Sequence, residues 1–128
     1  MTNARKLLGG WGEDLAANYL LHHGYTLLDR NARTPYGELD LVVRPPDVEG
    51  GNVTVFVEVK TRSSTRYGLP EESVTPRKQA HLVAAAQAYL LAHPELDGDW
   101  RIDVIAIQRY RSKRTPSITH FENAIRGD

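Results

Sequence analysis

The chain has 128 residues, of which 41% are hydrophobic, and its 16 basic residues balance 16 acidic ones. This length predicts one compact domain, residues 1–128, that buries about two-thirds of the surface of the unfolded chain. The absence of cysteine excludes disulfides, thiolate catalysis and cysteine-ligated zinc, and the balanced charge means that any nucleic-acid binding must use a local patch.

Apolar residues recur at helical spacing over residues 8–22, and Gly24 follows as a stop signal, which predicts a first helix. Glu13 falls at the margin of the apolar face, beside small residues that permit close approach to a sheet. It either faces a functional site or is an ordinary first-turn carboxylate favoured by the helix dipole. No run approaches the roughly 18 apolar residues of a membrane span, and the N-terminus lacks a secretory signal. We therefore expect a cytoplasmic protein that does not bind a membrane.

Three strands are predicted next, over residues 25–33, 39–43 and 53–61. The Pro- and Gly-rich segment 44–52 turns the second strand back onto the third, so that these two form a hairpin. Asp40 and Glu58 lie at positions that such a hairpin brings side by side. Because side chains alternate between the two faces of a strand, Glu58 and Lys60 point the same way.

Charged residues among valines and phenylalanine need a strong local reason, and a divalent metal ion is one such reason. Mg²⁺ takes oxygen ligands from one or two carboxylates, with waters and substrate phosphate completing its shell. Asp40, Glu58 and the backbone carbonyl of Val59 fit this set for Mg²⁺ or Mn²⁺. Lys60 would then stabilise or orient the attacking hydroxide.

The alternative interpretation of Glu58 and Lys60 is an ordinary surface ion pair, worth about 0–1 kcal/mol. Glu38 is also ambiguous, because it lies two residues from Asp40 and shares its strand face. It is either a ligand of a second ion or a structural partner of Arg62 or another base, and the second role is slightly favoured.

The segment that follows Lys60 is rich in hydroxyl and arginine side chains and carries one aromatic residue. Arg62, Arg66 and Tyr67 are candidates for phosphate contacts, although most segments of this composition are solvated loops.

A second helix is predicted over residues 77–93, with Thr75 as N-cap and Pro76 in the first turn. Arg77 and Lys78 lie in this exposed first turn, where the helix N-terminus adds backbone donors for an anion. They are candidates for nucleic-acid binding, and the alternative is ordinary helix-surface charge.

Two further strands are predicted at the C-terminal end, a buried one over residues 100–107 and an edge strand over residues 118–125. The basic turn 109–114 between them carries an aromatic residue. Such a turn either grips a nucleic-acid backbone or simply blocks edge pairing, and the second function is weakly favoured.

The order of helix, three-stranded meander, helix and strand, with Asp40 on the second strand and a Glu-x-Lys triplet on the third, resembles the PD-(D/E)XK nuclease superfamily. Within it, several motifs resemble the bacterial YraN-like family of uncharacterised proteins over nearly the whole chain. These motifs are Gly12-Glu13-Asp14-Leu15-Ala16, Gly37-Glu38-Leu39-Asp40-Leu41, Phe56-Val57-Glu58-Val59-Lys60-Thr61-Arg62 and Arg101-Ile102-Asp103-Val104.

This resemblance implies an α/β fold with a restriction endonuclease-like αβββαβ core, in which helices flank a mixed sheet of about five strands. It also implies roles for the charged residues: Asp40 and Glu58 as metal ligands, Lys60 as the catalytic cation and Glu13 as an accessory acid. Leu39 stands where the superfamily pattern has proline, a backbone-shaping residue without a chemical role.

Two functions follow as hypotheses. The first is a Mg²⁺-dependent nuclease that hydrolyses phosphodiester bonds of DNA, with branched or single-stranded DNA among the expected substrates. The second is a non-catalytic nuclease-fold module that binds nucleic acid or a protein partner. Symmetric cutting of two strands would require two sites and hence a dimer, and the sequence leaves the oligomeric state open.

Overall fold

The computed structural model of the chain describes residues 4–46, 52–63, 74–110 and 113–126. The elements follow one another as α1 (Ala4–His22), β1 (Thr26–Thr34), β2 (Gly37–Arg44), β3 (Val53–Arg62), α2 (Pro76–Ala92), β4 (Asp99–Gln108) and β5 (Ser117–Ile125). The predicted α/β class, with an αβββαβ core and a mixed sheet of five strands, is confirmed. In the described ranges, neither helix combines the length and the apolar character needed to cross a membrane.

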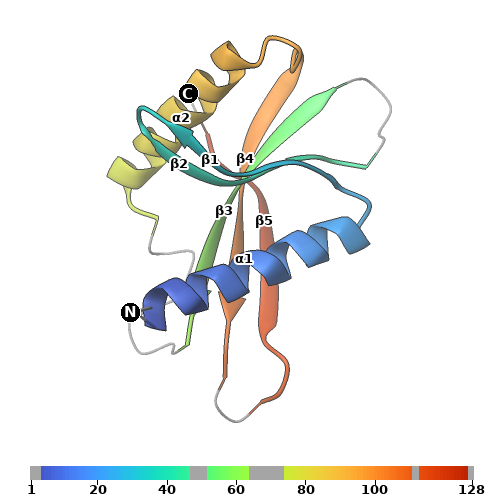
Figure 1. Cartoon of the computed structure of the whole chain (residues 1–128), viewed down its shortest axis with the longest axis vertical. Coiled ribbons are helices and arrows are strands. Elements are labelled where there is room, and N and C mark those ends of the chain that lie inside the picture. Colours follow the sequence, from blue (N-terminus) through green and yellow to red (C-terminus); the bar gives the residue numbers. More distant parts are fainter. Residues whose placement is uncertain (1–3, 47–51, 64–73, 111–112, 127–128) are drawn as a thin grey trace.

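The five strands lie in the sheet in their sequence order, β1-β2-β3-β4-β5 (Figure 1). β1 to β3 form an antiparallel meander, β4 runs parallel to β3, and β5 pairs antiparallel with β4 at the edge. The parallel step needs a crossover connection, which α2 provides between β3 and β4. The predicted hairpin of β2 and β3 and the predicted edge strand β5 are both present.

Local sequence signals account for the helix ends. Gly24, at φ +85°, takes the left-handed conformation that follows α1. Thr75 caps α2, where its hydroxyl accepts a hydrogen bond from the backbone N–H of Lys78 at 3.3 Å. α1 begins at Ala4, four residues before the predicted start.

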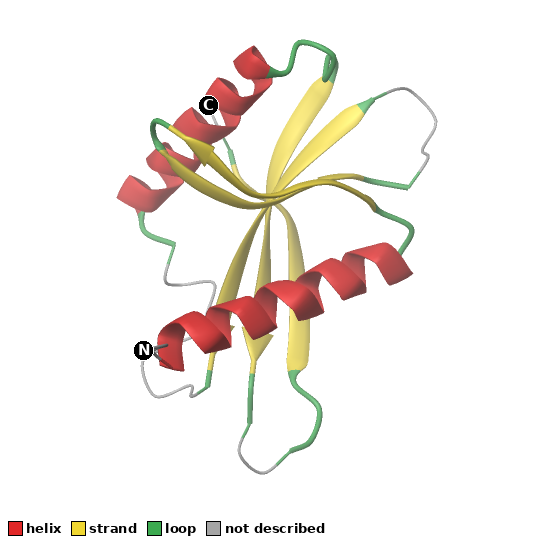
Figure 2. Ribbon diagram, viewed as in Figure 1, coloured by secondary structure: helices red, strands yellow, loops and turns green. Residues whose placement is uncertain are grey.

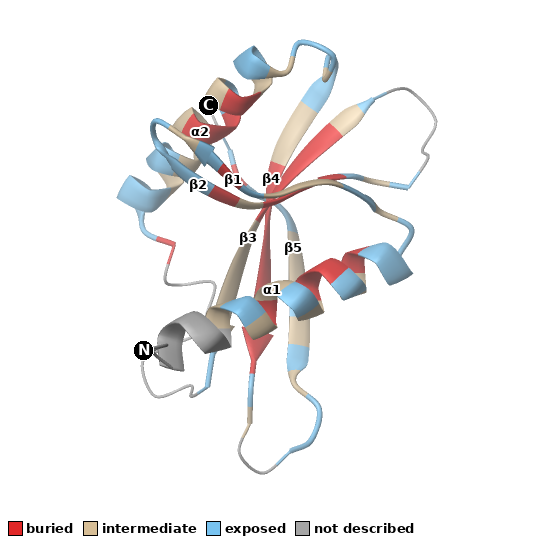
Figure 3. Cartoon of the chain, in the orientation of Figure 1, coloured by how far each residue is buried: buried red, intermediate tan, exposed pale blue. Residues whose placement is uncertain are grey.

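Two apolar clusters fill the two faces of the sheet, one beneath each helix, and Figure 3 shows buried segments in both helices and along β3 and β4. On the α1 face, small residues of the helix pack against alternate strand residues: Ala16, Ala17, Leu20, Leu41, Val55, Val57, Ile105 and Ile107. On the α2 face, the cluster includes Val42, Phe56, Ala85, Ala86, Tyr89, Ile102 and Val104. The alternation along β3 therefore places Glu58 and Lys60 on the face that α2 covers.

Gly12 allows α1 to lie directly against β3. A Cβ atom at this position would collide with the side chain of Thr61. Glycine is thus required for the close approach, which holds the next residue, Glu13, beside the sheet.

Candidate functional site

The sheet opens between β2 and β3 at the place where the predicted acidic residues lie. β2 and β3 are paired from Val43↔Val55 to Leu41↔Val57, and Asp40 and Glu58 would form the next pair. Beyond this point β2 stays paired with β1, while β3 stays paired with β4 through Arg62↔Gln108. The β1–β2 hairpin therefore leaves β3 and turns toward α2, as Figure 2 shows. We call this opening the β2–β3 fork.

Asp40 closes the fork with its side chain. Its Oδ2 accepts a hydrogen bond from the backbone N–H of Val59 at 2.8 Å, in place of a ladder bond from β2. The pKa of the Asp40 carboxyl is raised to about 8, first by burial, then by the negative charge of Glu58, with a smaller contribution from Glu13. The hydrogen bond from Val59 and the positive charge of Lys60 oppose these effects without cancelling them.

Glu58 and Lys60 form an ion pair on the same strand face, as predicted. Lys60 Nζ lies 3.1 Å from Glu58 Oε1, and the two side chains are only 18% and 15% exposed. Two carboxylates and one ammonium group thus share a largely enclosed space, where charges interact more strongly than in water.

Glu13 approaches this group from α1, but Arg30 also holds it. Glu13 Oε1 lies 3.3 Å from Arg30 Nε, and a second nitrogen of Arg30 lies 2.7 Å from Asp14. Asn31, turned so that its amide satisfies its neighbours, donates to Glu13 at 3.0 Å and to Glu38 at 3.1 Å. The partner of Glu38 here is thus the amide of Asn31, whereas the sequence predicted Arg62 or another base.

A cavity of about 210 Å³ adjoins the fork, between β3, the β1–β2 turn and α2. Glu58 and Lys60 line one side, and Tyr36 lies at the β1–β2 turn. From α2, Lys78 and His81 reach the same cavity.

Basic side chains gather around a second, larger cavity of about 510 Å³, near the ends of β3 and β4 at the bottom of Figure 1. Ser63 lines it together with Arg109, Tyr110, Lys113 and Arg114. The predicted basic turn thus contributes to a defined cavity whose described lining carries no carboxylate.

The donor set at the fork fits a hard divalent cation. Mg²⁺ binds through one or two carboxylates and completes its shell with water and phosphate oxygens. Asp40 and Glu58 supply two carboxylates, Val59 adds a backbone carbonyl, and a cation there would offset the repulsion that raises the pKa of Asp40. Across the described part of the chain, no group of three or more acidic or histidine side chains is placed to hold a metal ion. Glu13 is therefore not assigned as a ligand.

Comparisons with known proteins add a family to this geometry. Residues 12–107 match the model of a family described as "Uncharacterised protein family UPF0102". The chain belongs to UPF0102. This is the YraN-like family whose motifs the sequence resembles.

Relatives in UPF0102 align with the chain along nearly its full length. The UPF0102 protein of Syntrophomonas wolfei is 50% identical over 117 residues, which cover 91% of this chain and 96% of the relative. That of Pelotomaculum thermopropionicum is 45% identical and covers 97% of this chain and 99% of the relative. That of Geobacter sulfurreducens is 47% identical over 93% of this chain and 88% of the relative.

Among solved structures, SfsA of Pyrococcus furiosus, in complex with Ca²⁺, is similar over 92% of this chain and 63% of that chain. This chain therefore spans less than two-thirds of its length. The identity is 16% and the TM-score 0.38, and we draw no inference from a similarity of this size.

The residues predicted to contact nucleic acid lie in different surroundings in this UPF0102 chain. Lys78 lines the cavity beside the fork, whereas Arg77 is exposed on α2 and does not line it. Arg62 is exposed at the end of β3, where its backbone carbonyl accepts a hydrogen bond from Arg109 N–H at 2.8 Å. Arg66 and Tyr67 lie outside the described residues.

Tyr36 and His81 were not identified as site residues from the sequence. His81 follows Lys78 by three residues on a helix, so the two side chains share a face, and this spacing could have indicated it. Tyr36 offers a weaker signal, because its position depends on how the β1–β2 hairpin turns toward α2.

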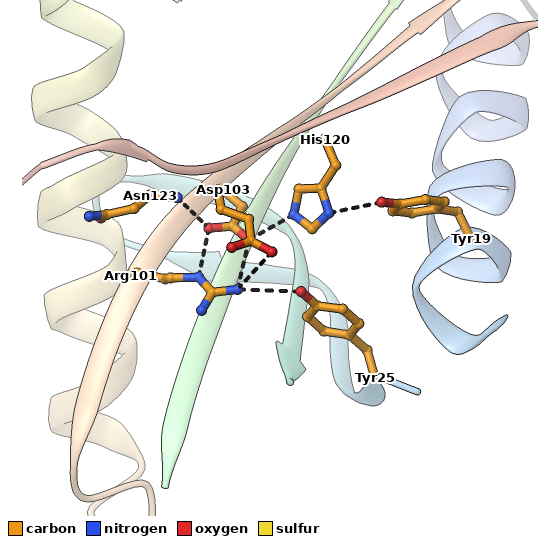
Figure 4. Close-up of polar contacts among 7 residues, drawn as sticks. Tyr19, Tyr25, Arg101, Asp103, His120 and Asn123 are labelled. Carbon is orange, nitrogen blue, oxygen red and sulfur yellow. Dashed lines mark hydrogen bonds and ion pairs between the residues drawn. The ribbon is translucent and has the colours of Figure 1, made fainter. Parts of the chain in front are cut away.

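A second buried aspartate, Asp103 on β4, lies on the α1 face and is 0% exposed. It accepts hydrogen bonds from Arg101 Nε at 3.0 Å, His120 Nε2 at 2.8 Å and the backbone N–H of Asn123 at 2.8 Å (Figure 4). Burial alone would raise its pKa, but these donors outweigh burial and hold the pKa of Asp103 below its usual value.

The contacts of Asp103 extend to two tyrosines. The Tyr19 hydroxyl lies 3.2 Å from Nδ1 of His120, and Arg101 donates to the Tyr25 hydroxyl at 3.3 Å. Asp103 thereby connects α1, the start of β1, β4 and β5. We call this set the Asp103 network. The sequence analysis did not identify this network, although an aspartate among isoleucines and valines, two residues after an arginine, could have indicated Asp103.

Proposed function

We propose that this UPF0102 chain is a divalent-metal-dependent nuclease that hydrolyses phosphodiester bonds of DNA, with single-stranded or branched DNA as the preferred substrate. The observation that carries the proposal is the convergence of Asp40, Glu58 and Lys60 at the β2–β3 fork. The pKa of about 8 means that the surrounding protein does not stabilise the ionised form of Asp40, which lies beside a second carboxylate. Such perturbed groups beside a cavity are typical of functional sites.

Each residue has a distinct role in the proposed reaction. Asp40 and Glu58, with the carbonyl of Val59, would hold Mg²⁺ or Mn²⁺. When bound, the ion supplies positive charge that polarises the phosphate and favours ionisation of the attacking water. Lys60 Nζ, kept close by Glu58, donates hydrogen bonds to the negative charge that develops on the phosphate oxygens. Glu13 acts as an accessory acid, which adds negative charge near Asp40.

Basic residues outside the fork would hold the substrate backbone. Lys78, at the adjoining cavity, is close enough to Glu58 and Lys60 to line the same space. Arg109, Lys113 and Arg114 belong to a lining whose described residues include no carboxylate, which suits phosphate groups farther along the strand. Arg62 and Arg77 are exposed on the surrounding surface, and Arg66 and Tyr67 complete the set that the sequence predicts.

A cleavage assay on a panel of nucleic acids tests the proposal. Single-stranded DNA, duplex DNA, a flap, a four-way junction and single-stranded RNA are incubated with Mg²⁺, with Mn²⁺ and with a chelator. We expect metal-dependent cutting of at least one DNA substrate. The Asp40→Asn and Lys60→Ala variants should cut that substrate about 100-fold more slowly or worse.

Asp97→Asn serves as the matched control, because it makes the same substitution at an exposed position in the turn after α2. It should cut like the wild type, and circular dichroism should establish that every variant is folded. Cutting that persists in the chelator, or that Asp40→Asn and Lys60→Ala leave unchanged, would contradict the proposal. Binding of DNA without any cutting would favour the non-catalytic module instead.

A further inference from the structure

The cavity of about 210 Å³ beside the fork combines two kinds of surface that a phosphate alone does not need. Glu58 and Lys60 form its side toward the proposed reaction centre. Apolar side chains also line it, from Val74, Leu82 and Ala85, of which Val74 and Ala85 are buried. A molecule held there would contact both the reactive pair and hydrocarbon.

The charges of the lining balance one another. Glu38 and Glu58 supply two carboxylates, and Lys60 and Lys78 supply two ammonium groups. Because these carboxylates and ammonium groups offset one another, the described lining as a whole does not select for an anion. A neutral ring with hydrogen-bonding edges and apolar faces suits the lining better, because the polar groups meet its edge and the apolar side chains meet its face.

Tyr36 provides an aromatic surface at this cavity. Its side chain is 56% exposed, so that one face of the ring is available to a ligand. The turn that carries it is fixed by Thr34, whose hydroxyl accepts from Tyr36 N–H at 3.1 Å and donates to the carbonyl of Gly37 at 2.7 Å. The aromatic group is therefore presented from an ordered turn and loses little conformational freedom when it stacks.

The size of the cavity limits what enters. Pockets that enclose drug-sized molecules measure about 300–1,000 Å³. This one is smaller, and it accommodates a single planar ring system with its substituents. A base that remains stacked and paired in a duplex cannot reach a recessed space of this kind, whereas an unpaired base can.

We propose that this cavity binds one unpaired nucleobase of the substrate strand, stacked against Tyr36, next to the phosphate at Asp40 and Glu58. The inference rests on the proposed nuclease function and deepens it: the substrate class becomes single-stranded or locally unpaired nucleic acid. Sequence-tolerant stacking of this type is common in proteins that bind single strands.

Binding without cleavage separates this inference from the nuclease proposal. The Asp40→Asn variant is titrated with a short single-stranded DNA that carries 2-aminopurine at one position, and with the same DNA lacking a base at that position. We expect the base-bearing strand to bind more tightly, with a change in 2-aminopurine fluorescence. Adding Tyr36→Ala should weaken its binding by about 5-fold to about 150-fold, the range expected for one base–aromatic stack.

Four controls sharpen the result. Tyr36→Phe keeps the ring and should bind like the parent, and Leu91→Ala removes an 86% exposed side chain elsewhere on α2 and should have no effect. Tyr36→Ala should leave binding of the abasic strand unchanged, because there is no base to stack. A duplex of the same sequence should bind more weakly than the single strand.

The inference is overturned if Tyr36→Ala weakens the abasic and base-bearing strands equally, if the duplex binds as tightly as the single strand, or if no DNA binds. These outcomes concern binding in a variant that should not cut. Metal-dependent cutting by the wild type together with any of them would contradict only the base site. Base-dependent binding together with no cutting would contradict only the nuclease.

Discussion

Asp40 and Asp103 lie at two places where the hydrogen-bond ladder of the sheet is interrupted. The surroundings of Asp103 stabilise its ionised form, whereas those of Asp40 destabilise it. Asp40 accepts the backbone N–H of Val59 where β2 leaves β3. Asp103 accepts the backbone N–H of Asn123, where β5 has three residues between the partners of Ile102 and Val104. In both places a carboxylate takes up a donor that the ladder has released.

The difference lies in the remaining neighbours. Asp103 also meets Arg101 and His120, so that its charge is compensated and its pKa is lowered. Asp40 is largely buried and also lies near Glu58 and Glu13, and its pKa is raised to about 8. A buried carboxylate with donors on every side stabilises the fold, whereas one that lacks compensation costs stability and is typical of a site that serves another purpose.

The largest expected effect of this contrast is on stability. Asp103→Ala leaves Arg101, His120 and the Asn123 N–H without their shared acceptor, so we expect a loss of about 3 kcal/mol or more in the free energy of unfolding. Asp40→Asn should lower this free energy little or raise it. Urea unfolding at neutral pH measures both, with Asp97→Asn as the exposed control. A loss below about 1 kcal/mol for Asp103→Ala would contradict the structural role.

The two aspartates should also differ in pH dependence. The folded pKa of Asp40 is above its unfolded value, so its contribution to stability is complete below about pH 4 and declines as the pH rises toward 8. Between those limits, the free energy of unfolding of the wild type should fall on the order of 2 kcal/mol relative to that of Asp40→Asn. This is less than the full pKa shift of Asp40 would give, because solvent partly screens the carboxyl. Parallel stability profiles for the two proteins would contradict this expectation.

Asp103 should act in a different range, because its folded pKa is below the unfolded value. Its contribution is present above about pH 4 and is lost as the pH falls further, through the folded pKa. Comparing wild type with Asp103→Asn below pH 4 measures this loss: the difference in stability between them should shrink as the solution becomes more acidic. A difference that stays constant would show that the carboxylate form is not what stabilises the network.

The smallest expected effect concerns the periphery of the Asp103 network. Tyr19→Phe removes the hydroxyl that lies 3.2 Å from His120 and leaves the ring in place. We expect a loss of about 0.5–1.5 kcal/mol in the free energy of unfolding. Tyr36→Phe removes an exposed hydroxyl and is the matched control, which should stay within about 0.5 kcal/mol of wild type. Equal effects of the two substitutions would remove Tyr19 from the network.

Periodicity and punctuation in the sequence predicted the fold well, because those signals are local. The run of β-branched and aromatic residues at Val55, Phe56 and Val57 indicated a strand, and Thr75 with Pro76 placed the start of α2 within one residue. The site was predicted partly for the same reason: Glu58 and Lys60 are two residues apart on one strand, so their common face follows from strand geometry.

What the sequence did not reveal depends on contacts between distant segments. At the β2–β3 fork the two strands stop pairing. No residue in the hairpin indicates that the Asp40 side chain, in place of the backbone of β2, accepts the hydrogen bond from Val59 N–H. The Asp103 network joins residues from Tyr19 to Asn123, and Tyr36 reaches the cavity only because its hairpin turns toward α2. Pairing over such separations is set by the packed structure as a whole.

We infer that the protein does not fully balance the negative charge of the carboxylates at the fork, and that a divalent cation binds there. Titration of the Asp40 carboxyl by ¹³C NMR, without and with Mg²⁺, tests both points most directly. We expect a midpoint near pH 8 without metal and a decrease of about 1–3 units when Mg²⁺ is added, because a nearby positive charge favours the ionised carboxylate. A midpoint close to the usual aspartate value that does not change with Mg²⁺ would contradict this account.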